Sequence, residues 1–262
     1  MTSLCRVLVI AVAVVALAGC ASPHADAPLP TWPVSPEPLP TAAPGTTDAQ
    51  ATCGGRSFPI GGLTAPADAA RATGPEFDAL RAAFAQFGRE FDGAAAWAWR
   101  LAGKDSAGAI FLARTDALGE PGWVSAEAVH GADGWKVVNM GQCRPHVVLS
   151  AEFGPATWAF DPAYSRPVAT TTELHVLVWE RDCSSGAPAT GRMSAPVVEY
   201  GQDSVTIAIG VRPIQLAPGM AVSCPLPPGT PASLVLAEPL GHRMLLDGGV
   251  LPPAPPSPAN PG

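Results

Sequence analysis

Charged residues are scarce in this 262-residue chain, and positive ones are the scarcer. Lysine and arginine total 15 against 22 aspartate and glutamate, which gives a formal net charge of −7. A nucleic-acid-binding chain needs a basic patch or stripe to meet phosphates, so this balance argues against a nucleic-acid partner. It also argues against adhesion to anionic lipid through a polybasic face.

The motifs of the common enzyme classes are also missing. The chain has no Gly-x-Ser-x-Gly elbow, His-Glu-x-x-His helix, Ser-x-x-Lys motif, Walker loop, Gly-x-Gly-x-x-Gly turn or calcium loop. No Cys-x-x-Cys occurs and the five histidines are scattered, so we expect neither a zinc ribbon nor a thioredoxin-type centre. The sequence therefore predicts no metal and no cofactor, and it leaves the catalytic residues unknown.

The first twenty residues carry an export signal. One positive residue, Arg6, precedes an apolar run over 7–18 that is too short to span a bilayer comfortably. The run ends in Leu17-Ala18-Gly19-Cys20, which resembles the lipobox of bacterial lipoproteins. That resemblance implies a signal peptide over 1–20 and a diacylated Cys20 as the first mature residue. It also implies attachment to the extracytoplasmic face of the cell membrane through this lipid, with palmitate among the acyl groups.

Proline is concentrated at the two ends of the mature chain. Residues 21–52 hold eight prolines and no apolar periodicity, so we expect a disordered spacer that reaches on the order of 90 Å at full stretch. The tail over 251–262 has the same composition and is expected to be disordered as well.

Four cysteines remain after Cys5 leaves with the signal and Cys20 takes the lipid. An even number in an exported chain indicates disulfides, and four cysteines permit three connectivities. We favour Cys53–Cys143 and Cys183–Cys224, because each pair then lies within one of two predicted modules.

The first module, over 53–161, is predicted to be α+β. A stripe of five apolar residues at spacings of 3 and 4 predicts an amphipathic helix over about 75–91: Phe77, Leu80, Phe84, Phe87 and Phe91. The pattern then changes to a period of two, with turn dipeptides at Pro121-Gly122 and Asp133-Gly134. These features predict a helix packed on an antiparallel meander, an order shared by cystatin-like folds. The strands are expected over 94–101, 109–115, from 123, from 135, over 146–151 and over 157–160.

The second module, over 168–250, follows a proline-containing boundary at 161–167 and reads as strands throughout. Its clearest period-two run covers 205–212. A small Ig-like antiparallel β-sandwich is the expected outcome. The strands are expected over 174–179, 196–200, 205–212, 233–237 and 243–246.

Three groups of side chains are candidates for chemistry. Glu180, Arg181 and Asp182 form a charged triplet at a strand end, which we interpret as solvated and worth at most about 1 kcal/mol. His242 and Asp247 have no partner in a catalytic motif. The Asp247 carboxylate is expected to cap its own turn by a hydrogen bond to the backbone two residues further along the chain. The third group is expected to form core rather than a binding face: Trp97, Trp99, Trp123, Trp135 and Trp158.

The leading hypothesis is a lipid-anchored envelope protein with a non-catalytic binding or scaffolding role toward an envelope protein or cell-wall component. The alternatives are an envelope hydrolase that uses His242, Asp247 and Glu180 through an unrecognised site, and a purely structural spacer. Thirteen arginines against two lysines, with abundant alanine and proline, are typical of a GC-rich bacterial genome. In this composition and in its lipobox the chain resembles secreted lipoproteins of actinobacteria. That resemblance implies no catalytic residues.

Overall fold

The fold is described from a computed structural model. It describes residues 29–33, 50–53, 56–87, 91, 93–115, 122–215, 221, 223–225 and 227–258. The predicted signal peptide and its Cys20 lie outside these residues. No helix in the described part of the chain has the length and hydropathy needed to cross a membrane.

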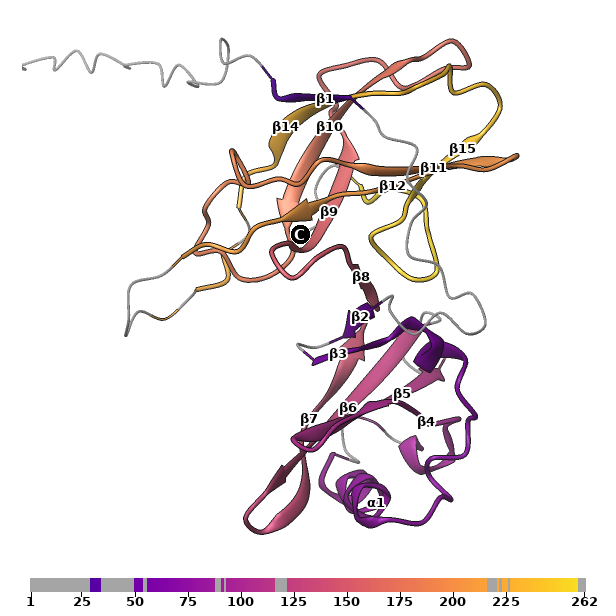
Figure 1. The fold of residues 1–262 in the computed structure, drawn as a ribbon, viewed down its shortest axis with the longest axis vertical. Coiled ribbons are helices and arrows are strands. Elements are labelled where there is room, and N and C mark those ends of the chain that lie inside the picture. The colour runs from indigo at the N-terminus through magenta and orange to yellow at the C-terminus, as the bar shows by residue number, and fades with distance from the viewer. Residues whose placement is uncertain are drawn as a thin grey trace, which may run out of the picture.

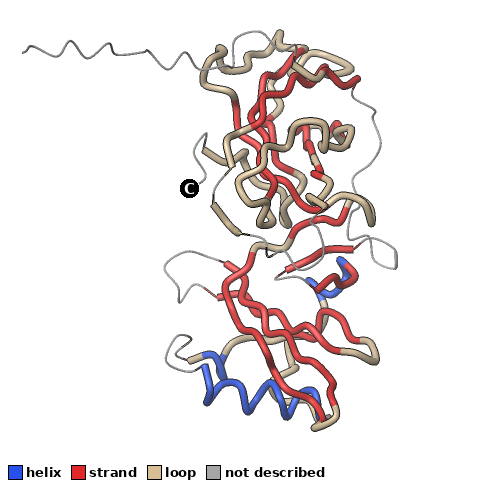
Figure 2. The backbone as a smooth tube through the Cα atoms, turned by 90° about the vertical axis from the view of Figure 1, so that its left-hand side faces the viewer, coloured by secondary structure: helices blue, strands red, loops and turns tan. Residues whose placement is uncertain are grey.

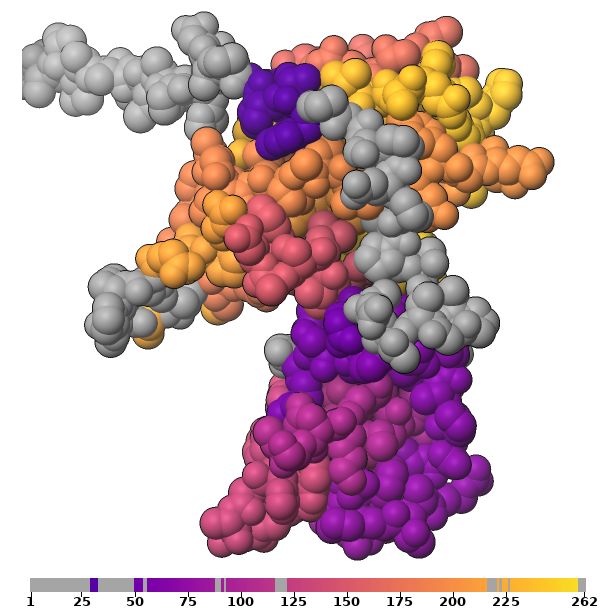
Figure 3. All heavy atoms as spheres, viewed as in Figure 1, coloured from indigo at the N-terminus to yellow at the C-terminus, as the bar shows by residue number. Residues whose placement is uncertain are grey.

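The chain forms two bodies, which meet at a narrower region (Figures 1 and 3). The α1 body, residues 50–148, is built on a four-stranded antiparallel sheet in the order β4-β5-β6-β7, so neighbouring strands are also consecutive in the chain. This is the predicted meander, and Gly134, in the left-handed region at φ 90°, makes the predicted turn between its two longest strands. The strands are β4 (Arg100–Lys104), β5 (Gly108–Thr115), β6 (Gly122–Gly131) and β7 (Gly134–Cys143).

Both faces of β5 are buried, which explains its nearly continuous apolar run. Ala109, Phe111 and Ala113 pack toward helix α1 (Pro75–Phe87), whereas Ile110 and Leu112 pack into a separate cluster on the opposite face. Alternate residues of a strand point to opposite faces, so one strand serves two cores. Figure 2 shows α1 beside the strands of the sheet. The α+β class is thus present in this body.

The opposite face is covered by a small antiparallel sheet in the order β3-β2-β8 and by a short 3-10 helix. The disulfide Cys53–Cys143 joins β2 to the end of β7 inside this second cluster. These elements are β2 (Gln50–Cys53), β3 (Arg56–Pro59), η1 (Ile60–Thr64) and β8 (His146–Val148).

The predicted helix is described over Pro75–Phe87, and residues 88–90 of the prediction lie outside the described residues. Phe91 is 7% exposed and lies in the core with the rest of the stripe, and its N–H donates 3.1 Å to the Phe87 carbonyl. One prediction for this body needs correction. Residues 94–101 do not form a strand: Ala94–Ala96 is a 3-10 helix, η2, and β4 begins only at Arg100. The reason is local, because Trp99 Nε1 donates a 2.7 Å hydrogen bond to the Ala94 carbonyl and holds a turn there.

The β9 body consists of β1 and residues 154–258. Its five-stranded sheet has the order β1-β14-β10-β9-β13, and its three-stranded sheet has the order β11-β12-β15. The larger sheet contains β1 (Thr31–Pro33), β9 (Gly154–Phe160), β10 (Glu173–Glu180), β13 (Gly210–Val211) and β14 (Thr230–Val235). The smaller contains β11 (Val197–Tyr200), β12 (Ser204–Ala208) and β15 (Met244–Asp247).

One core joins the two sheets of this body. Trp158 and Val176 from the larger sheet lie in the same buried cluster as Val198 and Ile207 from the smaller. The sequence predicted purely antiparallel sheets, and this prediction is wrong. Strand β1 pairs parallel to β14, and β12 pairs parallel to β15. The period-two run over 205–212 is also divided between β12 and β13. Strand periodicity gives the buried face but carries no information on the direction of the partner.

Strand β9, which the sequence assigned to the first module, belongs to the sheet of the second. Its register with β10 runs from Val176 opposite Phe160 to Glu180 opposite Ala156. The prolines between 161 and 167 therefore lie in the loop that joins two paired strands, not at a boundary between modules.

Parts of both proline-rich segments are ordered. In the predicted spacer, Thr31–Pro33 forms β1 and Gln50–Cys53 forms β2. In the predicted tail, Leu251 N bonds to Pro145 O at 2.9 Å and Ser257 N bonds to Trp158 O at 3.1 Å. Local composition missed these contacts because the bonding groups come from remote strands. Residues 21–28, 34–49 and 259–262 lie outside the described residues.

Both disulfides have the expected pairing, Cys53–Cys143 and Cys183–Cys224. The two differ in burial: Cys53 is 3% exposed, whereas Cys183 and Cys224 are both exposed. The first bond is therefore part of a core, and the second fastens two surface loops.

Candidate functional site

The two bodies are joined by hydrogen bonds as well as by the chain between β8 and β9. Residues 249–251, which follow β15, return to β8, where Val147 N donates to Gly249 O at 2.9 Å. The His146 ring nitrogen Nδ1 lies 3.2 Å from the same carbonyl. The segment after β15 therefore forms one side of the junction, and the ends of the long strands of the α1 body form the other.

A cavity of about 360 Å³ lies at this junction. We call it the junction pocket. Its lining comes from β5, from the start of β6, from the end of β7 and from the segment after β15: Arg114, Gly122, Trp123, Cys143, Arg144, Leu251, Pro252 and Ala254.

Strand register places the polar lining of the junction pocket. Arg114 of β5 lies opposite Trp123 of β6, and Trp123 lies opposite Cys143 of β7. The Arg114 guanidinium carbon is 5.7 Å from the Trp123 ring centroid, and that of Arg100 is 5.5 Å from it. The indole is 9% exposed, so it supports two cations and offers little free surface to a ligand.

Two buried titratable groups lie beside the pocket. His146 is 4% exposed; burial, with a smaller contribution from the charges of Arg181 and Arg144, lowers its pKa to about 3. Its Nε2 has no hydrogen-bond partner among the described residues. Asp247 is 3% exposed, and burial raises its pKa to about 6 against the lowering effects of Gly249, Arg144 and Arg181. At neutral pH the His146 imidazole is therefore neutral, and the Asp247 carboxyl group is ionised in most molecules.

The three titratable residues named for a hydrolase have separate surroundings. Asp247 Oδ1 accepts 2.8 Å from Gly249 N, which is the predicted cap of its own turn. Glu180 accepts 2.6 Å from Arg192 Nη1. His242 is exposed, and its side chain has no hydrogen bond to any described residue. None of the three lines the junction pocket.

The charged triplet differs from its prediction as a solvated strand end. Arg181 and Asp182 are exposed, but Glu180 is 6% exposed and burial raises its pKa. Its partner is Arg192 on the following loop rather than a neighbour in the triplet. The only sequence signal for the burial of Glu180 was its position, which continues the alternating buried positions of β10.

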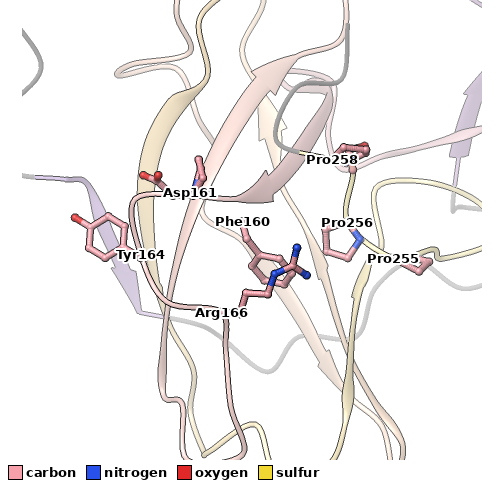
Figure 4. A pocket seen from close by; sticks show the side chains of 9 residues that line it. Phe160, Asp161, Tyr164, Arg166, Pro255, Pro256 and Pro258 are labelled. Carbon is pink, nitrogen blue, oxygen red and sulfur yellow. The ribbon is translucent and has the colours of Figure 1, made fainter. Parts of the chain in front are cut away.

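A second, larger hollow of about 610 Å³ lies between the loop after β9 and the C-terminal prolines (Figure 4). Arg166 lies beside the Phe160 ring, while Tyr164 points away from it. The Tyr164 ring stacks on His175 at a centroid distance of 3.8 Å, and Asp161 Oδ1 accepts 2.9 Å from Ala163 N. Its polar groups thus mainly hold the loop, which makes this hollow the weaker candidate.

The predicted core tryptophans behave as expected. Trp99 and Trp158 are fully buried and Trp123 is nearly so, while Trp97 and Trp135 pack against the α1 core with part of each ring exposed. Sequence reasoning missed Arg114 and Arg144 as pocket residues. Arg114 follows Ile110 and Leu112 at a spacing of two. Its one available signal was therefore a charged residue on the strand face that carries buried apolar residues.

Within the described ranges, no cluster of three or more histidine, cysteine, aspartate or glutamate side chains could hold a metal ion. Comparisons with protein-family models, with curated proteins and with solved structures give no match to this chain. The chemistry of the junction pocket is therefore argued from its own residues.

Proposed function

We propose that this protein is a lipoprotein held at the extracytoplasmic face of the cell membrane through Cys20, with a non-catalytic role in binding an envelope component. The observation that carries the binding role is the composition of the junction pocket. Its side chains are two guanidinium groups, an indole, a disulfide and apolar groups. Such a lining can hold and orient a ligand, but its described residues supply no nucleophile and no general acid or base at neutral pH.

The buried groups nearby fit a binding role better than a hydrolytic one. A general base must reach the proton it removes, within about 3 Å or through one water molecule. Asp247 uses Oδ1 to hold Gly249, and Glu180 is occupied by Arg192. The hydrolase alternative needs these residues and His242 together, and they do not share a pocket.

The fold proposed for the β9 body is a two-sheet sandwich, Ig-like in the loose sense. The shared core between the larger and smaller sheets supports it. The two parallel pairs, β1 with β14 and β12 with β15, set it apart from a strictly antiparallel Ig domain.

The proposal is tested by photo-crosslinking in intact cells. A photoreactive amino acid replaces the lining residue Ala254 in the full-length chain, and a matched variant carries it at Val168, which is 62% exposed and lines neither cavity. We expect a discrete adduct in the membrane fraction from position 254 and none from position 168. We expect Cys20→Ser to move the protein out of that fraction or to leave the signal uncleaved.

Two results would contradict the proposal. One is an unmodified mature chain, starting at another residue, in the membrane fraction. The other is an adduct at position 254 that the wild-type protein, added in excess, chemically converts rather than retains.

A further inference from the structure

The arginines of this chain fall into two groups by their partners. Those of the first group each form an ion pair with a carboxylate: Arg56, Arg81, Arg192, Arg212 and Arg243. Those of the second have no carboxylate within salt-bridge distance among the described residues: Arg71, Arg100, Arg114, Arg144, Arg166 and Arg181. Two of these six, Arg114 and Arg144, line the junction pocket, and Arg100 and Arg181 are their neighbours, although the chain as a whole is negative.

Contacts place the four arginines near one another. Arg114 and Arg144 line the pocket, and Arg100 shares the Trp123 ring with Arg114. The Arg181 pKa is lowered, mainly by the protein that packs around part of this side chain and next by the charge of Arg144. The two guanidinium groups are therefore near each other. The carboxylates that act on Arg181 are Asp182 and the buried Asp247. Among the described residues, cations outnumber carboxylates around this cavity, a balance that favours the binding of an anion.

Trp123 prepares the arginines for a ligand. A guanidinium over an indole face keeps its edge N–H groups free, and those donors match the two oxygens of a carboxylate or phosphate. Such a group loses little further rotamer freedom when it binds. The disulfide Cys53–Cys143 fixes the residue before Arg144 to strand β2, which restricts the backbone of the opposite wall.

We propose that the junction pocket binds a small anion with two or more negative charges, a phosphate or dicarboxylate group, through Arg114 and Arg144. Arg100 and Trp123 are positioning residues for Arg114. A cavity of about 360 Å³ is in the lower range of small-molecule sites. This inference rests on the proposed binding function and adds the chemical class of its ligand.

The test is isothermal titration of the full-length protein in a nonionic detergent at pH 7. The probes are sodium pyrophosphate, sodium succinate and, as the source of lipid phosphate, mixed micelles that contain phosphatidic acid, with sodium chloride at matched ionic strength as the blank. We expect saturable binding of at least one dianionic probe. Which probe binds distinguishes a soluble phosphate, a carboxylate and a lipid headgroup.

Arg114→Gln and Arg144→Gln should each weaken that binding about ten- to hundredfold, since each removes charge-assisted hydrogen bonds. Arg71→Gln is the matched control, because Arg71 is also exposed and without an ion pair but lies outside the pocket. Its affinity should equal that of the wild type. The absence of saturable binding to every probe, or equal affinities in Arg114→Gln and Arg71→Gln, would overturn the inference.

The two proposals fail separately. A crosslinked envelope component at position 254 without anion binding refutes only the ligand class. Anion binding by a protein that chemically converts its crosslinked partner refutes the non-catalytic role and leaves the anion site in place.

Discussion

The α1 body and the β9 body differ in how their strands find partners. In the α1 body, β4 to β7 are neighbours in both the chain and the sheet. In the β9 body, β14 lies between β1, some 200 residues earlier in the chain, and β10, and β12 pairs with β15. Hairpin neighbours can be recognised from turn dipeptides, whereas remote partners are selected by tertiary packing. The β9 body therefore depends more on individual long-range contacts.

The largest effect is expected at the ion pair that closes the loop after β10. Arg192 binds Glu180 at 2.6 Å and donates to the carbonyls of Pro188 and Arg212 at 2.9 and 2.6 Å. Arg192→Ala leaves the Glu180 carboxylate buried and unpaired, so we expect a loss of about 3–5 kcal/mol in the free energy of unfolding. Urea denaturation at pH 7 measures it.

The control is Arg212→Ala, whose partner Glu152 is exposed. A surface pair of this kind contributes about 0–1 kcal/mol. Adding Glu180→Gln to Arg192→Ala should recover part of the loss by removing the unpaired charge. Equal losses in Arg192→Ala and Arg212→Ala would show that burial of Glu180 is energetically unimportant.

The sequence was most informative where physical chemistry is local. The phenylalanine stripe gave the helix and its buried face, and Asp133-Gly134 gave the hairpin between β6 and β7, because spacing and turn conformation decide both. The sequence could not give the docking of Thr31–Pro33 on β14 or the return of residues 249–257 to the junction. Those segments are proline-rich and carry no periodicity, and their bonding partners lie on remote strands.

The same limit applies to the candidate site. Asp247 was identified with its correct turn contact, but its neighbours His146 and Arg144 lie about a hundred positions away. The pocket arginines come from separate segments, Arg114 from β5 and Arg144 from the residues after β7, and only the strand register brings Arg114 to Trp123. A site assembled by register has no motif of fixed spacing.

The next effect concerns the junction and depends on pH. Burial raises the pKa of Asp247 from 3.8 to about 6, so its contribution to the free energy of unfolding falls as pH rises through this range. Burial chiefly lowers the pKa of His146 from 6.5 to about 3, so its contribution rises with pH over that range. Between pH 4 and 6 the two contributions nearly cancel.

Single variants should reveal this cancellation. Relative to the wild type, Asp247→Asn should gain stability as pH rises from 4 to 6, by about 1.4 kcal/mol per pH unit and about 3 kcal/mol in all. His146→Gln should show the opposite slope. Urea denaturation at several pH values measures both, with the exposed Asp133→Asn as control. A pH profile of Asp247→Asn parallel to that of the wild type would contradict the raised pKa of Asp247.

The smallest effect tests whether β1 belongs to the β9 body. Trp32 lies opposite Leu234 and packs, half-buried, against the core, while Ser233 N donates 3.1 Å to Pro30 O. Trp32→Ala should cost about 1–2 kcal/mol, less than a fully buried tryptophan, because part of the ring is exposed. Urea denaturation measures it, with the exposed Val168→Ala as a control expected within about 0.5 kcal/mol. An unchanged Trp32→Ala would mean that β1 adds nothing.

This small effect has a large geometric consequence. With β1 paired to β14, eight residues separate the proposed anchor Cys20 from Leu29, and they can span at most about 30 Å. That is a third of the reach expected for a spacer that is free throughout. With the proposed lipid at Cys20, the paired strand would hold the β9 body close to the membrane surface and the α1 body farther from it, since β1 and α1 lie at opposite ends of the molecule (Figure 1). Faster proteolysis between residues 29 and 33 in Trp32→Ala than in Val168→Ala would show that this pairing shortens the tether.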